Sequence, residues 1–245
     1  MERVFISDLH LEQPDSERFL RFAELLQAES ASVDELYILG DLVEMWVGDD
    51  DDSELAVTLQ AALKQASTCC EVFLLHGNRD FLFGDVFAAA CGVTLINEPY
   101  VLDGNLLLMH GDALCTDDVE YQTQRAFYLR PETQAGLLAQ PLAARKLLGQ
   151  QLRAKSRSEN ASKATNIMDV NDDAVLEALH ANAATTLLHG HTHRPGQHQH
   201  DQCTRVVLGD WERCGWLCRQ TDGRLQLECF SLARHYENER SHPGS

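Results

Sequence analysis

The sequence lacks a long apolar run, lacks paired cysteines and has far fewer basic residues than acidic ones. Only one short apolar stretch precedes Asp8, so we expect neither a signal peptide nor a membrane-spanning helix, and we expect a cytoplasmic protein. The eight cysteines lack the Cys-x-x-Cys spacing of zinc and redox sites, and we interpret most of them as reduced core thiols. The formal net charge of -18 argues against nucleic acid as a partner, because phosphate backbones are bound by clustered Lys and Arg.

What the sequence does contain is enough apolar material for a large core. The 245 residues are 44% hydrophobic, which suits one large domain or a domain with an insertion. Residues 16–29 have apolar side chains at helical spacing with Ser16 as N-cap, and residues 54–66 predict a second helix. Helices alternating with apolar runs predict parallel strands, right-handed crossovers and an α/β/α layering.

Five apolar runs each end in a loop that carries Asp, His or Asn. The runs are residues 4–6, 36–39, 72–75, 106–109 and 186–188. Open α/β sheets place ligands at the carboxyl ends of their strands, so we expect these polar residues to meet at one rim. Asp41, directly after Gly40, is the natural bridge between them. The residues delivered in this way are Asp8, His10, Asp41, Asn78, His110, His191 and His193.

These seven side chains are chemically suited to metal ions. Carboxylate, amide and imidazole groups together favour Mn²⁺, Fe²⁺ or Zn²⁺ and are too rich in nitrogen for Ca²⁺. Seven ligands exceed what one ion needs, so the set predicts two ions about 3.5–4 Å apart that are bridged by Asp41. Such a pair clamps a phosphoryl group and lowers the pKa of a bridging water. A single histidine is more often an ordinary core or surface residue, but five strand ends together favour a metal site.

The C-terminal part of the chain predicts shorter strands. Hairpins around residues 221–223 suggest an antiparallel second sheet. Residues 234–245 are polar and without periodicity, which predicts a flexible tail. The acidic run 49–52 is interpreted as a solvated loop rather than a metal site. The short strands are expected in residues 205–210, 215–218 and 225–230.

A segment that we call the cap, residues 119–165, differs from the rest of the chain. Its apolar residues form helical phrases, and from Glu120 to Thr165 eight basic residues face three acidic ones, a balance of +5. Its leucines could pack inward as an ordinary helical hairpin or could offer an apolar wall to acyl chains, and the pattern alone allows both. These leucines are Leu137, Leu138, Leu142, Leu147, Leu148 and Leu152.

Five motifs, in this order, resemble those of the calcineurin-like metallophosphoesterases: Asp-x-His, Gly-Asp-x-x-Glu, Gly-Asn-Arg-Asp, His-Gly-Asp and Gly-His-Thr-His. The resemblance implies an α/β/β/α sandwich formed by residues 1–118 and 166–233, with the cap inserted as a helical lipid-binding element and 234–245 as the tail. It also implies that Glu44 and Asp80 orient metal ligands. The first metal would be held by Asp8, His10, Asp41 and His193, and the second by Asp41, Asn78, His110 and His191.

One position departs from the commonest family pattern. Arg79 stands where most members carry a histidine after the Asn, and that histidine is usually thought to protonate the leaving group. A guanidinium keeps its proton at ordinary pH, so Arg79 can neutralise phosphate charge but cannot act as a general acid. We therefore expect a leaving group that needs no proton, such as a phosphate released from a pyrophosphate.

Longer stretches, over about residues 3 to 230, resemble the UDP-2,3-diacylglucosamine pyrophosphohydrolases of the lipid A pathway. The resemblance implies two Mn²⁺ per subunit and hydrolysis of a lipid-linked nucleotide sugar to UMP and 2,3-diacylglucosamine 1-phosphate. It also implies peripheral attachment to the cytoplasmic face of the inner membrane. From the basic charge of the cap, we expect Arg153, Lys155 and Arg157 to face anionic lipid. We expect a monomer. Catalysis would fall to Asp41, Asn78, Arg79 and His110, and substrate contacts to Asn78, Arg79, Asp118, Ser156, Asn160, Lys163 and His191.

Two other functions fit the same residues. The first is hydrolysis of another nucleotide anhydride, and comparable cleavage of a UDP-sugar without acyl chains would favour it. The second is a metal-binding scaffold whose site is catalytically silent, which any Mn²⁺-stimulated cleavage of a phosphate anhydride would exclude.

Overall fold

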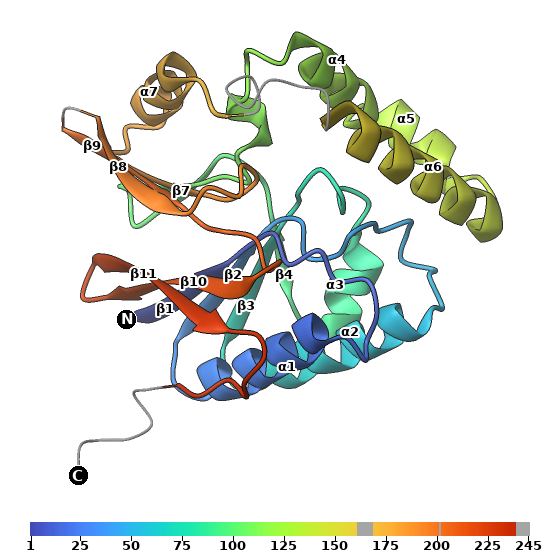
Figure 1. Cartoon of the computed structure of the whole chain (residues 1–245), viewed down its shortest axis with the longest axis horizontal. Coiled ribbons are helices and arrows are strands. Elements are labelled where there is room, and N and C mark those ends of the chain that lie inside the picture. The colour runs from blue at the N-terminus through green and yellow to red at the C-terminus, as the bar shows by residue number, and fades with distance from the viewer. Residues whose placement is uncertain (161–168, 201, 239–245) are drawn as a thin grey trace.

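The computed structural model describes residues 1–160, 169–200 and 202–238, and for 155–160 it describes the backbone alone. Two β-sheets pack face to face at its centre (Figure 1). In the first sheet, ordered β11-β10-β1-β2-β3-β4, strands β1 to β4 run parallel and the β10–β11 hairpin joins antiparallel to β1. The strands are β1 (Glu2–Ile6), β2 (Glu35–Leu39), β3 (Glu71–Leu75), β4 (Thr94–Ile96), β10 (Cys214–Thr221) and β11 (Arg224–Ser231).

The second sheet is mixed and has the order β5-β6-β7-β9-β8. Its three central strands are parallel, and the two edge strands run antiparallel to them. The predicted antiparallel second sheet is therefore wrong, because the late hairpin extends the first sheet while β9 pairs in parallel with β7. The strands are β5 (Tyr100–Leu102), β6 (Leu106–Leu108), β7 (Thr186–His189), β8 (Gly196–His200) and β9 (Cys203–Val207).

Helices cover the outer faces of both sheets, which makes the layering α/β/β/α rather than the α/β/α expected from periodicity (Figure 1). Side chains of β1 show why: Val4 and Ile6 pack toward the helices, while Phe5 between them packs toward the other sheet. Strands buried on both faces read as continuous apolar runs, so periodicity does not tell a helix from a second sheet as the covering layer. The first sheet is covered by α1 (Glu17–Ser30), α2 (Glu54–Ala66) and α3 (Asp85–Cys91), and the second by α7 (Asp172–Ala181).

The described part of the cap is helical, as predicted. Its helices lie together at one end of the sandwich, away from α1 and α2 (Figure 1). No helix in the described ranges is both long and apolar enough to cross a membrane. The cap helices are α4 (Val119–Tyr128), α5 (Pro131–Leu138) and α6 (Leu142–Asn160), preceded by a short 3₁₀ helix at Asp112–Leu114.

The described part of the predicted flexible tail contacts the core. Tyr236 N donates to Glu24 Oε2 at 2.8 Å, and Asn238 Nδ2 donates to Ser32 Oγ at 3.1 Å. These contacts hold residues 235–238 against α1 and the turn after it, which the polar composition gave no sign of. The rest of the predicted tail, 239–245, lies outside the described residues.

Candidate metal centre and adjoining cavity

The loops after β1, β2, β3, β6 and β7 meet at one edge of the sandwich. Three of these loops come from the first sheet and two from the second, so the polar residues converge across two sheets instead of along one. The structure brings all seven sequence-predicted ligands together there. Two groups form, with Asp41 between them.

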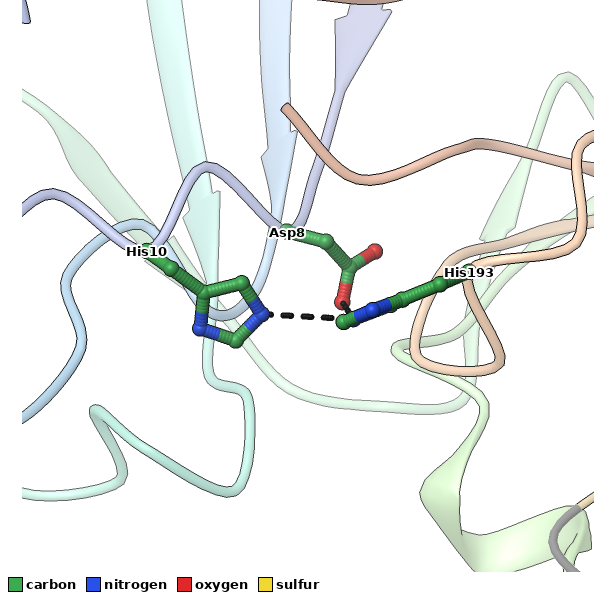
Figure 2. Close-up of side chains that lie close together, drawn as sticks. All are labelled: Asp8, His10 and His193. Atoms are coloured by element: carbon green, nitrogen blue, oxygen red, sulfur yellow. Dashed lines mark hydrogen bonds and ion pairs between the residues drawn. The ribbon is translucent and has the colours of Figure 1, made fainter. Parts of the chain in front are cut away.

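The first cluster consists of Asp8, His10 and His193 (Figure 2). His193 Nε2 lies 3.4 Å from Asp8 Oδ1 and 3.2 Å from His10 Nε2. The fully buried Asp8 carboxylate also accepts hydrogen bonds from the backbone N of His191 and from Ser7 Oγ. Burial opposes ionisation of Asp8, but the hydrogen bond from His193 and the nearby imidazoles outweigh it and hold its pKa below the usual range.

The second cluster consists of Asp41, His110 and His191, with the amide of Asn78 among them. Asn78 Oδ1 lies 3.1 Å from His110 Nε2 and 3.0 Å from His191 Nδ1. Asp41 Oδ1 lies 3.7 Å from His110 Nε2, and its Oδ2 lies 3.8 Å from His10 Nε2. Asp41 thus turns one oxygen toward each cluster, as a bridging ligand would.

Buried carboxylates and imidazoles at the centre shift one another's pKa values in opposite directions. Burial opposes a proton on His110, yet the carboxylates of Asp41 and Asp8 outweigh burial and raise its pKa to about 10. Burial and the neighbouring His110 instead lower the pKa of His191 to about 4. In each cluster the ligand atoms lie within 4.8 Å of one another. Carboxylate, imidazole and amide donors this close together fit a pair of divalent cations.

The backbone of the ligand loops is strained. Asp8, His10, Asp41, His191 and His193 all have positive φ, between 48° and 63°. Such conformations are uncommon outside glycine and cost about 1–3 kcal/mol each, so the surrounding fold must hold them in place. Concentration of this strain in one place is typical of functional sites.

Glycines next to the ligands allow the loops to approach one another. A Cβ on Gly77 would lie 2.2 Å from Asp41 Oδ1, and one on Gly190 would lie 2.0 Å from Asp8 Oδ2. The Gly-Asn and Gly-His pairs in the motifs therefore have a steric reason.

Groups behind the ligands orient them. His110 Nδ1 donates to the carbonyl oxygen of Leu39 at 2.9 Å, which leaves Nε2 free for a metal. Glu44 Oε2 lies 3.1 Å from His10 Nδ1 and can do the same for that ring. Asp80 accepts hydrogen bonds at 2.7 Å from the backbone N of Leu42 and of Gly77, which ties the β2 and β3 loops together.

A cavity of about 560 Å³ lies between the cap and the core, beside the second cluster. Its volume is in the range of small-molecule sites. Asn78 and Arg79 lie in its wall, together with apolar groups of both the core and the cap. The apolar lining includes Met45, Trp46, Phe81, Met109, Leu137, Leu148 and Leu152.

Comparisons with known proteins agree with this geometry. Residues 1–195 match the family model described as calcineurin-like phosphoesterase. The chain belongs to the calcineurin-like phosphoesterase family. The resemblance inferred from the motifs is thereby confirmed, and with it a metal-dependent hydrolase.

Curated relatives are similar over nearly the whole chain of this calcineurin-like phosphoesterase. A protein of Marinobacter nauticus named UDP-2,3-diacylglucosamine hydrolase is 43% identical over 88% of this chain and 92% of its own length. Proteins with the same name from Cellvibrio japonicus and Salmonella paratyphi B are 44% and 41% identical over 95% of this chain and 100% of their own lengths.

The structure describes the side chains of some predicted substrate contacts but not of others. Arg79 lines the cavity, and its backbone N donates to Asp41 Oδ1 at 2.8 Å. The buried carboxylate of Asp118 accepts a hydrogen bond from Tyr121 N at 3.0 Å, so it caps α4. Ser156 and Asn160 belong to α6, where only the backbone is described, and Lys163 lies outside the described residues.

Several residues at the site of this phosphoesterase escaped the sequence analysis. The ring of Tyr121 lies 5.7 Å from that of His191, and its hydroxyl donates to Asp112 Oδ2 at 2.9 Å. Arg125 pairs with Asp112 and with Glu98, which accepts a hydrogen bond from the backbone N of His110. Of these residues, only Asp112 belongs to a sequence motif, His-Gly-Asp. Tyr121 and Arg125 lie on α4 and reach the site only because the cap docks on the core, which no motif predicts.

The acidic run 49–52 is solvent-exposed at Asp50 and Asp52, as interpreted, but its side chains also contact the core and the cap. Asp49 accepts hydrogen bonds from the backbone N of Gly84 and Phe87 at the start of α3. Asp50 pairs with the buried Arg145 of α6, and the next two acids pair with Lys146. Basic residues of the cap thus meet acidic residues of the core, which accounts for the reversed charge of the insertion.

Proposed function

We propose that this protein hydrolyses the pyrophosphate bond of UDP-2,3-diacylglucosamine, giving UMP and 2,3-diacylglucosamine 1-phosphate (lipid X) in lipid A biosynthesis. The observation that carries the proposal is a cavity with apolar walls from cap and core that also contains Asn78 and Arg79, beside the metal clusters. The apolar walls suit the acyl chains of such a substrate, and Arg79 and the metal clusters suit its anionic pyrophosphate. The names of the curated relatives support this substrate.

The residues of the chain have distinct tasks in this reaction. Two divalent cations, which we take to be Mn²⁺, would supply Lewis acidity and a water of lowered pKa at the two clusters. Asp41 holds the clusters at a fixed separation, because each of its oxygens faces one of them. Arg79, in the cavity wall, offsets the charge on the pyrophosphate oxygens. It donates no proton, and a departing sugar phosphate needs none.

The cap supplies the lipid specificity in this proposal. Leu148 and Leu152 line the cavity from α6, and positions 156 and 160 continue their spacing of four residues. This periodicity supports Ser156 and Asn160 as substrate contacts, with Lys163 kept as a third. Leu147, next to the cavity-lining Leu148, is instead exposed. The cap leucines therefore divide between the cavity and the outer surface.

The outer surface of the cap supports peripheral attachment to the cytoplasmic face of the inner membrane. Large apolar side chains at the membrane surface add to affinity in proportion to the area that they bury. Both clusters and the cavity belong to a single chain, which supports a monomer as the active unit. The exposed apolar residues of the described cap are Val119, Phe127, Leu129, Leu138 and Leu147.

The experiment that tests the function measures UMP release by purified protein with Mn²⁺. The acylated UDP-sugar is compared with the same sugar without acyl chains, in detergent, at matched concentrations. We expect much higher kcat/KM for the acylated substrate and no reaction after chelation of the metal. Equal efficiency on both substrates would favour a general nucleotide-anhydride hydrolase, and Mn²⁺ binding without turnover would favour a silent metal-binding scaffold.

A further inference from the structure

One arginine of the cap reaches the first metal cluster through a single carboxylate. Arg153 of α6 forms ion pairs with Glu12 and Glu44 of the core, and its Nε lies 2.6 Å from Glu44 Oε1. The other oxygen of Glu44, Oε2, lies 3.1 Å from Nδ1 of His10. Arg153, Glu44 and His10 thus form a chain from the cap to a predicted metal ligand. This position differs from the lipid-facing one expected for Arg153, and that expectation is wrong.

The chain has a physical consequence for His10. An imidazole binds a metal well when its other nitrogen is protonated and its ring is held, commonly by a carboxylate. The Glu44 carboxylate has two partners, one at each oxygen, and the ion pair of Oε1 with Arg153 leaves Oε2 directed at His10.

We propose that Arg153 is a positioning residue that couples docking of the cap to metal affinity at the first cluster. The inference deepens the proposed function and rests on its two-metal site. The Arg153–Glu44 contact forms only when α6 is docked, so docking holds Glu44 and hence His10 in the ligating geometry. The coupling is reciprocal, and a bound metal therefore favours the docked cap.

A second cation on α6 provides a matched control. Lys146 Nζ lies 2.7 Å from Asp51 Oδ1 and 3.5 Å from Asp52 Oδ1. This pair also docks the cap, but neither acid belongs to a metal cluster. A variant at Lys146 removes one docking contact and leaves the path to His10 intact.

The test is a Mn²⁺ titration of the metal-stripped full chain, in which the EPR signal reports free Mn²⁺. Wild type is expected to bind two ions. Arg153→Gln should weaken one of them about 10-fold and leave the other unchanged, as is usual for loss of a group that orients a ligand. Arg153→Lys, which keeps the charge without the planar fork, should fall between the two. Lys146→Gln should match wild type.

A second measurement follows hydrogen exchange in α6 with and without Mn²⁺. The metal should slow exchange in wild type and in Lys146→Gln, and should slow it less in Arg153→Gln. Saturating Mn²⁺ should restore kcat of Arg153→Gln, which a lost substrate contact would not allow. Thermal melts of each variant establish that it is folded.

Two results would overturn the inference. One is a pair of unchanged Mn²⁺ affinities in Arg153→Gln, and the other is an equal loss in Lys146→Gln, which would mean that any docking contact acts alike. The titration contains no substrate, so it separates the two proposals. The expected affinities without UMP release would contradict the proposed function alone, whereas a wild type that binds fewer than two ions would contradict both.

Discussion

The metal clusters and the cap are assembled by opposite means. Asp8, Asp41 and His110 are buried at strand ends, where strained loops are held by the packed sheets beneath them. In the cap, α4 and α5 have no buried residues, and ion pairs with the core hold α4 and α6. Partly exposed ion pairs contribute little, typically about 0–1 kcal/mol each. A rigid metal centre suits bond cleavage, and a lightly held cap suits entry of a lipid.

The largest effect on activity is expected in the metal centre, from substitution of Asp41. Asp41→Asn removes charge from the carboxylate between the clusters, and kcat should fall at least about 1,000-fold, since metal catalysis contributes several kcal/mol. Metal content and rate are measured on one preparation. Asp52→Asn, which changes an exposed acid near the cap, should retain both metals. Full activity of Asp41→Asn with two metals bound would refute its bridging role.

A smaller loss is expected at Arg79, where the cavity meets the metal loops. Arg79→Ala should lower kcat/KM for the acylated UDP-sugar about 100-fold to 1,000-fold, the range for removal of one preorganised charge donor. Arg79→His should not recover it, because the leaving phosphate gains little from a proton while bidentate charge contact is lost. It should instead raise the ratio of activity on a simple phosphodiester. If Arg79→His exceeds wild type on the UDP substrate, the leaving-group argument is wrong.

Two glycine substitutions separate the cost of a positive φ from the cost of a steric clash between the ligand loops. Gly40 and Gly104 both have positive φ, but a Cβ on Gly40 would lie 2.6 Å from Gly77 and from His110 Nδ1, whereas Gly104 has open space. Gly104→Ala should cost about 1 kcal/mol of unfolding free energy and keep the metals. Gly40→Ala should cost about 1–3 kcal/mol more and lose metal. Denaturant melts and metal analysis decide this, and equal costs would contradict a steric role for Gly40.

The smallest effect on activity is expected in the cap. Leu148→Gln places a polar group in the cavity, and we expect about a 10-fold loss of kcat/KM on the acylated substrate, with the unacylated one unaffected. Its neighbour Leu147 is exposed, so Leu147→Gln should keep this rate in detergent and reduce binding to anionic liposomes. Reversed or identical results for the two variants would contradict the division of the cap leucines.

The predicted metal site shows what a one-dimensional pattern can carry. An apolar run followed at once by Gly-Asp or His-Gly specifies both a buried strand and the polar residue at its end, because both are local. Asp41 and His110 could therefore be selected from the sequence. The sequence could not show that these residues come from two different sheets. A strand buried on both faces has the same apolar pattern whether helices or a second sheet cover it.

The sequence by itself determined the strand ends, the seven candidate ligands, the helical nature of the cap and the family. Only the tertiary structure decided where the cap charges go. Arg153 meets Glu44, and Arg145 meets Asp50, across 109 and 95 positions of chain. A salt bridge leaves no periodic trace in sequence, because any exposed cation can pair with any nearby acid once the fold has brought them together.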